Sequence, residues 1–256
     1  KYLSSVITQD LIFYHEGTRI DIVSHVDWKE KNILLRGYVP VNIHAEQATY
    51  EIQYGNVQRP THYNTSWEQA RFEVCAHKWI DMSEDGYGVS ILNDCKYGYD
   101  VHDGVIGLTM LKSAVYPNPD ADKESHEFAY AIISHQGGWR ENGTIQQAYL
   151  FNNPLSAVRK RNTGGIMPKE FSFVEINRKN IVIEVVKMAE DGDGVILRMY
   201  EAFNRRTDAV LYFFRPILSA AECDMLENEE KRLSAEDRRI QVSFRPYEIK
   251  TLKIHF

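Results

Sequence analysis

Short runs in which apolar and polar residues alternate make up most of the chain. In the run 19–28, every second residue from Ile20 to Trp28 is apolar except Ser24. A period of two is typical of a strand that buries one face and exposes the other. The same pattern predicts further strands over 33–41, 49–54, 72–80, 87–92, 105–111 and 127–134.

The second half of the chain continues the pattern. Apolar runs at 181–189 and 195–203 flank Glu190-Asp191-Gly192-Asp193-Gly194, which predicts a hairpin. The segment 222–239 is rich in Glu, Lys, Arg and Leu, and its thin apolar stripe leaves open whether it is a helix or a charged loop. Further strands are predicted over 210–214, 240–244 and 248–256.

Many strands and little helix predict an all-β fold, with large antiparallel sheets packed as a β-sandwich. Asp-Gly and Asn-Gly pairs at 85–86, 103–104 and 142–143 supply turns between the strands. The long connection 152–168 is rich in Pro, Asn and Gly and marks the predicted boundary between subregions. We therefore assign 1–160 to the main part of the sandwich, and 161–256 to its continuation and a smaller C-terminal β subregion.

Charge and cysteine content narrow the classes of function. The 36 acidic and 30 basic residues are interspersed, for a net charge of −6, and this pattern does not predict a nucleic-acid surface. No apolar run is long enough to predict a membrane span. Three cysteines are too few for a disulfide framework, so we expect a protein of the cytoplasm.

Two pairs of side chains suggest metal ligands. His25 and Asp27 alternate onto one face of a predicted strand, and so do Cys75 and His77, to which Cys95 or His62 could add a ligand. A zinc site takes three or four ligands, so a polar strand face and a buried cysteine are the simpler interpretations. The sequence also has no Gly-x-Ser-x-Gly elbow and no phosphate-binding glycine loop.

Two loops combine aromatic and polar residues at 59–67 and 93–98. Sugar faces stack on aromatic rings while hydroxyls bond to polar groups, so carbohydrate contact is one interpretation. The alternative for the first loop is packing against another domain. The alternative for the second loop is a plain turn. The candidate substrate-proximal or domain-facing residues are His62, Tyr63, Asn64, Trp67, Asn93, Asp94, Lys96 and Tyr97.

At these loops the sequence resembles glycoside hydrolase family 38 α-mannosidases, in the branch that contains cytosolic, vacuolar and bacterial members. The resemblance begins with Glu-Ile-Gln-Tyr-Gly at 51–55 and Arg-Pro-Thr-His-Tyr-Asn-Thr-Ser-Trp at 59–67. It continues through 70–79, 92–98, 126–131, 197–201 and 244–252. These segments span nearly the whole chain.

The resemblance implies an N-terminal α/β barrel, a small helical bundle and β-sandwich regions similar to the galactose-mutarotase supersandwich. This chain corresponds to the sandwich regions. In the family a catalytic Asp nucleophile, a carboxylic acid partner and a zinc held by His and Asp belong to the barrel. The resemblance therefore assigns no catalytic residue and no metal ligand to this chain.

One loop departs from related members. In Golgi and lysosomal proteins of the family, the loop matching Asp94 to Gly98 carries an Arg after its Asp and approaches the active site. Here Cys95 takes that place and Lys96 follows it. Either Lys96 supplies the cation or the loop only packs against the barrel.

The resemblance implies a retaining α-mannosidase as the parent protein, acting on terminal α-mannosides. Its expected partners are the N-terminal barrel of the same polypeptide and the substrate, with no nucleic acid and no membrane. The fragment alone is expected to be inactive, and its uncovered docking face to favour a homo-oligomer. The alternative is an autonomous carbohydrate-binding or interaction module.

Overall fold

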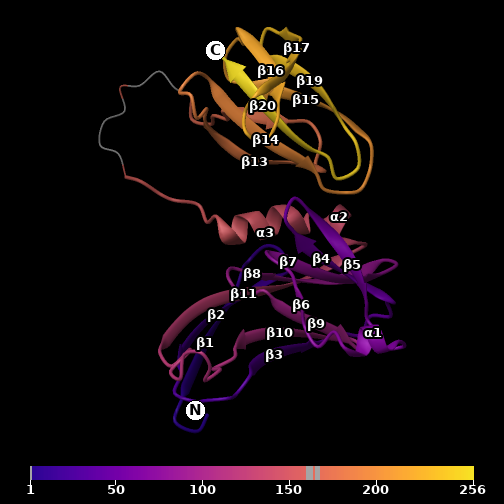
Figure 1. Cartoon of the computed structure of the whole chain (residues 1–256), viewed down its shortest axis with the longest axis vertical. Helices are drawn as coiled ribbons and strands as arrows, with labels where there is room; N and C mark the ends of the chain where they lie inside the picture. The colour runs from indigo at the N-terminus through magenta and orange to yellow at the C-terminus, as the bar shows by residue number, and fades with distance from the viewer. Residues whose placement is uncertain (1, 160–163, 165–167) are drawn as a thin grey trace. The chain divides into compact units, whose positions relative to one another are not determined.

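The computed structural model describes residues 2–159, 164 and 168–256. They form two compact units, Lys1–Ser156 and Ala157–Phe256, each with strands of its own (Figure 1). The predicted boundary between residues 160 and 161 lies outside the described residues. Every strand pairing in the described part is antiparallel, and the all-β prediction is confirmed.

The first unit is a sandwich of two sheets. The larger sheet has the order β1 (Val6–Phe13), β2 (Arg19–Asp27), β11 (Ser125–Gln136), β8 (Tyr87–Asn93), β7 (Trp79–Glu84), β4 (Gln47–Ile52), β5 (Gly55–Pro60). The smaller sheet has the order β3 (Leu35–Pro40), β10 (Val105–Leu111), β9 (Gly98–His102), β6 (Val74–Cys75). Figure 1 shows the two layers stacked.

Alternation places the apolar residues between these sheets. Ile80 and Ile91 of the larger sheet pack with Tyr99 and Leu108 of the smaller sheet, and all four are buried. The polar interruption at Ser24 is also buried, and its hydroxyl accepts a hydrogen bond from Gln9 Nε2 at 3.0 Å. The period of two in the sequence therefore identified the face that forms the core.

Three short helices accompany these sheets: α1 (Ser66–Gln69), α2 (Trp139–Asn142) and α3 (Thr144–Asn152). Trp79 of β7 lies 5.0 Å from Trp139 of α2, between ring centroids, and α2 and α3 cover the face of the larger sheet that the smaller sheet leaves open. We predicted a turn at Asn142-Gly143, and instead Gly143 ends α2 at a φ of +75°. None of the described helices is long and apolar enough to cross a membrane.

The predicted strand 72–80 is wrong in its middle. It is split into β6, which ends at Cys75, and β7, which begins at Trp79. Cys75 is exposed and His77 lies in the connection, so the two side chains do not share a strand face as we had expected. Ala76, in the connection between β6 and β7, is completely buried.

A fully buried polar cluster lies where α3 covers the larger sheet. His135 Nε2 lies 2.8 Å from Asp81 Oδ2 and 3.1 Å from Ser90 Oγ, which in turn lies 2.9 Å from Thr144 Oγ1. Burial opposes the charge of His135, but the hydrogen bond and charge of Asp81 outweigh it and raise the pKa of the imidazole. Gly88 is required beside this cluster, because a Cβ there would overlap His135.

The second unit is a smaller sandwich with its own core. One sheet has the order β12 (Val174–Ile176), β15 (Thr207–Phe213), β19 (Arg239–Phe244), β18 (Ala235–Glu236). The other has the order β13 (Ile181–Met188), β14 (Val195–Glu201), β20 (Ile249–His255), β16 (Ser219–Cys223), β17 (Glu229–Leu233). The hairpin predicted at 190–194 joins β13 to β14. The segment 222–239, left open between helix and loop, contains strands.

A buried carboxylate closes one end of the second unit. Glu201 is completely buried, and its side chain accepts hydrogen bonds from Asn180 Nδ2 at 2.8 Å and from the backbone N–H groups of Phe203, Arg205 and Tyr247 at 2.7, 3.1 and 3.1 Å. The carboxylate thus holds together three chain segments that are far apart in sequence.

The His135–Asp81 pair predicts a pH dependence of folding. Because the pKa of His135 is raised in the folded state, its stabilisation is fully present below about pH 6.5 and is lost as pH rises through the raised pKa. The denaturant midpoint of the first unit should therefore fall between pH 6 and pH 9. Asp81→Asn should cost about 3 kcal/mol at pH 6 and flatten this dependence. An equally steep dependence in the variant would contradict this prediction.

Glu201→Gln should destabilise the second unit. The amide group would point a donor at groups that already donate, at a cost of about 1–3 kcal/mol. Urea unfolding followed by a probe in the second unit measures the change. Glu230→Gln, an exposed carboxylate on β17, serves as the control and should change the midpoint little.

Candidate functional site

The first candidate loop is held by a small helix cap. The Thr65 side chain accepts from the backbone N–H of Glu68, and the Glu68 carboxylate accepts from the backbone N–H of Thr65 at 2.9 Å. His62 Nδ1 lies 3.4 Å from Glu68 Oε2. Partial burial raises the pKa of Glu68, but the Thr65 hydrogen bonds and the nearby His62 outweigh it and hold that pKa below its ordinary value. The cap therefore fixes the loop as one unit.

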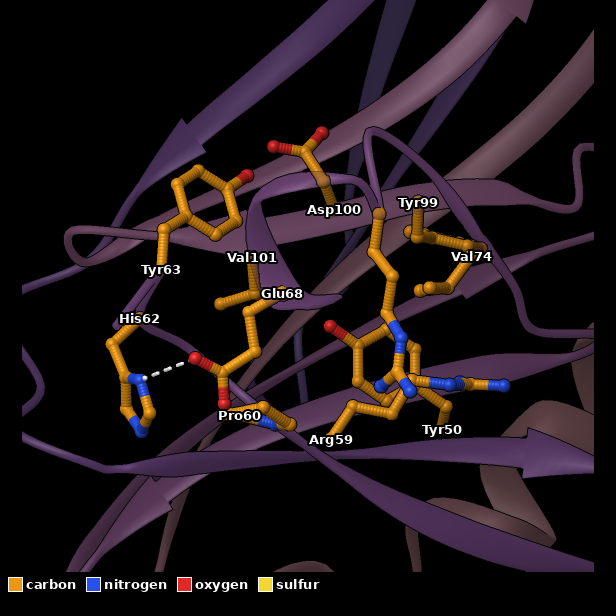
Figure 2. Close-up of a pocket in the computed structure, with 11 residues that line it drawn as sticks. Tyr50, Arg59, Pro60, His62, Tyr63, Glu68, Val74, Tyr99, Asp100 and Val101 are labelled. Carbon is orange, nitrogen blue, oxygen red and sulfur yellow. Dashed lines mark ion pairs between the residues drawn. The ribbon is translucent and has the colours of Figure 1, made fainter. Parts of the chain in front are cut away.

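This loop borders a cavity on the first unit. Figure 2 shows Glu68 reaching toward His62 at one side and Arg59 lying against Tyr50 at the other. The cavity measures about 30 Å³, and its lining residues are Tyr50, Arg59, Pro60, His62, Tyr63, Glu68, Arg71, Val74, Tyr99, Asp100 and Val101. A volume of this size holds water and excludes a sugar ring.

Arg59 and His62 each place a buried nitrogen without a hydrogen-bond partner at this cavity, as far as the described residues show. In Arg59 this nitrogen is Nη1. The guanidinium carbon of Arg59 lies 4.5 Å from the centroid of the Tyr50 ring. Burial lowers the pKa of Arg59 and raises the pKa of Tyr50. The cavity therefore presents an N–H donor to a water molecule or another small acceptor.

Tyr63 connects the loop to the smaller sheet. Its ring stacks on His102 at 3.8 Å between centroids, with the planes 10° apart. Burial and the charge of Asp100 raise the pKa of Tyr63, so the phenol stays protonated at neutral pH. Tyr63 thus anchors the loop to the last residue of β9.

The outer side of the same region exposes aromatic rings. Trp67 is 79% exposed on α1, and Phe72 is 80% exposed just before β6. Asn64 is also exposed. Exposed aromatic rings can stack on a sugar or pack against another domain.

The second candidate loop is built around Asn93. Its Nδ2 donates to the Tyr99 hydroxyl at 2.5 Å, and its Oδ1 accepts from the backbone N–H of Lys96 at 2.8 Å. Asp94 Oδ2 accepts from the backbone N–H of Ala129 at 2.9 Å. These bonds make Asn93 and Asp94 supports for the loop.

Lys96, Tyr97 and Cys95 form the outer part of this loop. Lys96 Nζ lies 4.6 Å above the Phe128 ring and has no carboxylate partner among the described residues. The Tyr97 ring meets His77 edge-on at 5.4 Å. Burial raises the pKa of the Cys95 thiol to about 11, with a further contribution from Asp94. The loop therefore offers a cation and a phenol, while its thiol stays protonated.

The two loops meet β9 at its opposite ends. The second loop runs directly into Gly98, where β9 begins, and Tyr63 of the first loop stacks on His102, where it ends. Four residue steps in a strand span about 13 Å. Both loops therefore border the strand that carries Tyr99 and Asp100.

His25 and Asp27, the first pair considered as metal ligands, interact with other charged side chains. His25 Nδ1 lies 3.8 Å from Glu127 Oε2, and Asp27 Oδ2 lies 2.8 Å from Lys29 Nζ. In the described part of the chain, no three His, Cys, Asp or Glu side chains are placed to hold a metal ion.

Sequence reasoning missed Arg59, Tyr99 and Asp100 as lining residues of the cavity. Arg59 stood inside the quoted run 59–67, but nothing in that run shows that its guanidinium turns inward. Tyr99 and Asp100 reach the cavity through the pairing of β9 with β6 and β10, which joins segments far apart in sequence.

Two models of one family match the chain. "Glycosyl hydrolases family 38 C-terminal domain" matches residues 1–120, and "Glycosyl hydrolases family 38 C-terminal beta sandwich domain" matches residues 180–252. They fall on the first and the second unit respectively.

Proteins similar in sequence carry α-mannosidase names. Alpha-mannosidase 2C1 of Homo sapiens is 39% identical over 254 residues, which cover 97% of this chain and 24% of that protein. Alpha-mannosidase G of Dictyostelium discoideum is 36% identical, covering 96% of this chain and 23% of that protein. An alpha-mannosidase of Saccharomyces cerevisiae is 33% identical, covering 93% and 24%. The chain thus spans about a quarter of the length of these relatives.

Solved structures share the fold. A crystal structure of an alpha-mannosidase from Enterococcus faecalis V583 superposes with a TM-score of 0.84 at 19% identity, covering 97% of this chain and 29% of that chain. A second structure from Enterococcus faecalis, of a protein in glycosyl hydrolase family 38, gives a TM-score of 0.81 at 19% identity, covering 97% and 30%. The likeness at this identity shows a common architecture. With both family models and these relatives in agreement, the chain belongs to the C-terminal region of glycosyl hydrolase family 38.

Proposed function

We propose that this chain is the C-terminal β-sandwich part of a longer retaining α-mannosidase, and that it supports and borders an active site held by the rest of the polypeptide. The observation that carries the proposal is the agreement of two family 38 models with relatives named alpha-mannosidase. Because the chain spans about a quarter of those relatives, most of such an enzyme lies outside it.

The chemistry of a retaining glycosidase supports this division of labour. It uses two carboxyl groups about 5–5.5 Å apart, one as nucleophile and one as acid and base. The carboxylates near the candidate loops have structural roles instead: Glu68 caps α1, and Asp94 holds the Ala129 backbone. The two catalytic carboxylates are therefore proposed to come from the absent catalytic barrel.

The same reasoning applies to the metal. The resemblance implies a zinc ion in the catalytic domain, whereas the described residues of this chain offer no donor set that fits one. The part proposed for this chain is to position loops, with Lys96 and the exposed Trp67 as groups that meet the substrate or the barrel.

The proposed compartment is the cytoplasm. All three cysteines are free, and Cys75 and Cys95 are exposed. Exposed thiols persist as thiols in a reducing environment.

An autonomous carbohydrate-binding module is the second candidate. Trp67 and Phe72 favour it, since exposed rings can stack on sugars. The cavity of about 30 Å³ next to the same loop does not add a sugar pocket to these rings, which weakens this candidate. Titration of the 256-residue chain with mannose oligosaccharides separates the two, since saturable binding supports the module.

The isolated 256-residue chain should bind no stoichiometric zinc and release no product from an aryl α-mannoside. The physical reason is that the described residues hold no complete ligand set, and that the carboxylates Glu68 and Asp94 of the candidate loops have structural roles. Metal analysis and a release assay measure both. One tightly bound zinc per chain, or turnover that a chelator removes, would contradict the prediction.

Lys96→Ala in the full-length protein should lower kcat/KM for an aryl α-mannoside by up to about 150-fold. A charged hydrogen bond contributes about 1.5–3 kcal/mol, which sets this range. Lys29→Ala, which removes an exposed lysine paired with Asp27, is the control and should leave activity unchanged.

The thermal midpoint of the Lys96→Ala variant distinguishes a lysine that contacts the substrate from one that only stabilises the loop. Unchanged activity with a lower midpoint would show that Lys96 only packs on Phe128 and does not reach the substrate.

A further inference from the structure

The side chains of β1, the first strand of the larger sheet, are unusually exposed to solvent. β1 pairs with β2 along all eight of its residues and has no neighbour on its other edge among the described strands (Figure 1). Seven of these eight residues are exposed, and only Ile7 is half-buried. An edge strand in a complete sandwich normally buries one of its two faces.

Three of the four β1 residues on the face that should be buried are apolar. Ile7, Gln9, Leu11 and Phe13 lie opposite Val26, Ser24, Ile22 and Ile20 of β2, which form the inner face of that strand. Ile7 at one end packs into the core, but Leu11 is 57% and Phe13 is 68% exposed. The inner face of β1 is therefore covered at Ile7 and exposed at Leu11 and Phe13.

The missing cover is visible as an apolar opening between the two sheets. The smaller sheet ends at β3, and in the described part of the chain no further strand of that sheet extends over the outer half of β1. The opening measures about 250 Å³ and is lined by Gln9, Leu11, Ile20, Ile22, Gly37, Tyr38, Val39, Ile91, Ile106, Leu108, Tyr130 and Ile132. A cavity of about 150 Å³ already accepts an aromatic ring, so large apolar side chains fit here.

The edge of β1 also lacks the features that protect other edges. Asp10 is its only charged residue, it has no proline, and its register with β2 is continuous. In contrast β17, an edge of the second unit, reads Glu-Glu-Lys-Arg-Leu, and the edge strand β13 contains a register shift. Charges and bulges of this kind block pairing with further strands, and β1 has one charge and no bulge.

We propose that the larger sheet continues past β1, and that an extended segment of the same polypeptide outside residues 1–256 pairs with β1 and turns apolar side chains toward Leu11 and the opening. The inference rests on the proposed function only in requiring a longer polypeptide. The relatives, of which the chain spans 23–24%, have ample length to supply such a segment. Backbone pairing satisfies the unpaired N–H and C=O groups of the edge, and the side chains close the sandwich.

Hydrogen exchange tests the pairing directly. About half of the amide hydrogens in an edge strand point away from its single partner. In the 256-residue chain these amides in 6–13 should exchange quickly, and in the full-length protein they should slow by at least about tenfold. Equal, fast exchange in both proteins would overturn the proposal, because covering by side chains alone leaves these amides unpaired.

Leu11→Lys tests the apolar cover. In the full-length protein it should lower the thermal midpoint, while in the 256-residue chain it should leave the midpoint unchanged and reduce self-association. Leu226→Lys, at a leucine that is 81% exposed in the turn before β17, is the matched control and should do neither. A midpoint that also falls in the 256-residue chain would mean that the second unit covers β1, and would overturn the proposal.

A second copy of the chain is the remaining occupant to exclude. If the full-length protein is a dimer that Leu11→Lys converts to a monomer in sedimentation, the partner at β1 is a second copy and the proposal fails. Activity on an aryl α-mannoside is scored separately. An active protein with fast-exchanging β1 amides refutes this inference alone, and an inactive protein with protected amides refutes the proposed function alone.

Discussion

The structure of the first unit depends on the burial of its central strands, β7 and β8, on both faces. One face is apolar and packs against the smaller sheet through Ile80 and Ile91. The other carries Asp81 and Ser90, which water would otherwise solvate, so the helices must cover it with partners in place. His135 supplies the principal partner, and leaving a buried carboxylate without one costs several kcal/mol. The helix position, the glycine at 88 and the register of β11 all follow from this requirement.

Sequence pattern predicted the fold where a strand buries only one face. Residues 19–28 alternate cleanly, and the structure buries the face that the alternation marks. The pattern was less informative for β1, whose residues are mostly exposed, and for α3, which has no clear apolar stripe along its nine residues. The split between β6 and β7 was also missed, since an apolar run does not show where a chain crosses from one sheet to another.

The candidate site was predictable only in part. Composition and resemblance selected the loops 59–67 and 93–98, and the structure places them at the two ends of β9. The cavity beside the first loop depends on Arg59 turning onto Tyr50 and on Asp100 arriving from another strand. Those positions are set by tertiary pairing between distant segments, for which a single sequence carries no signal.

The thiol of Cys95 gives the second loop a chemical property of its own. With a pKa of about 11, roughly one molecule in ten thousand carries a thiolate there at neutral pH. Peroxides and electrophiles react with the thiolate, so Cys95 should react more slowly than an exposed cysteine with an ordinary pKa. The second loop can therefore face solvent with a thiol that is oxidised less readily than one with an ordinary pKa.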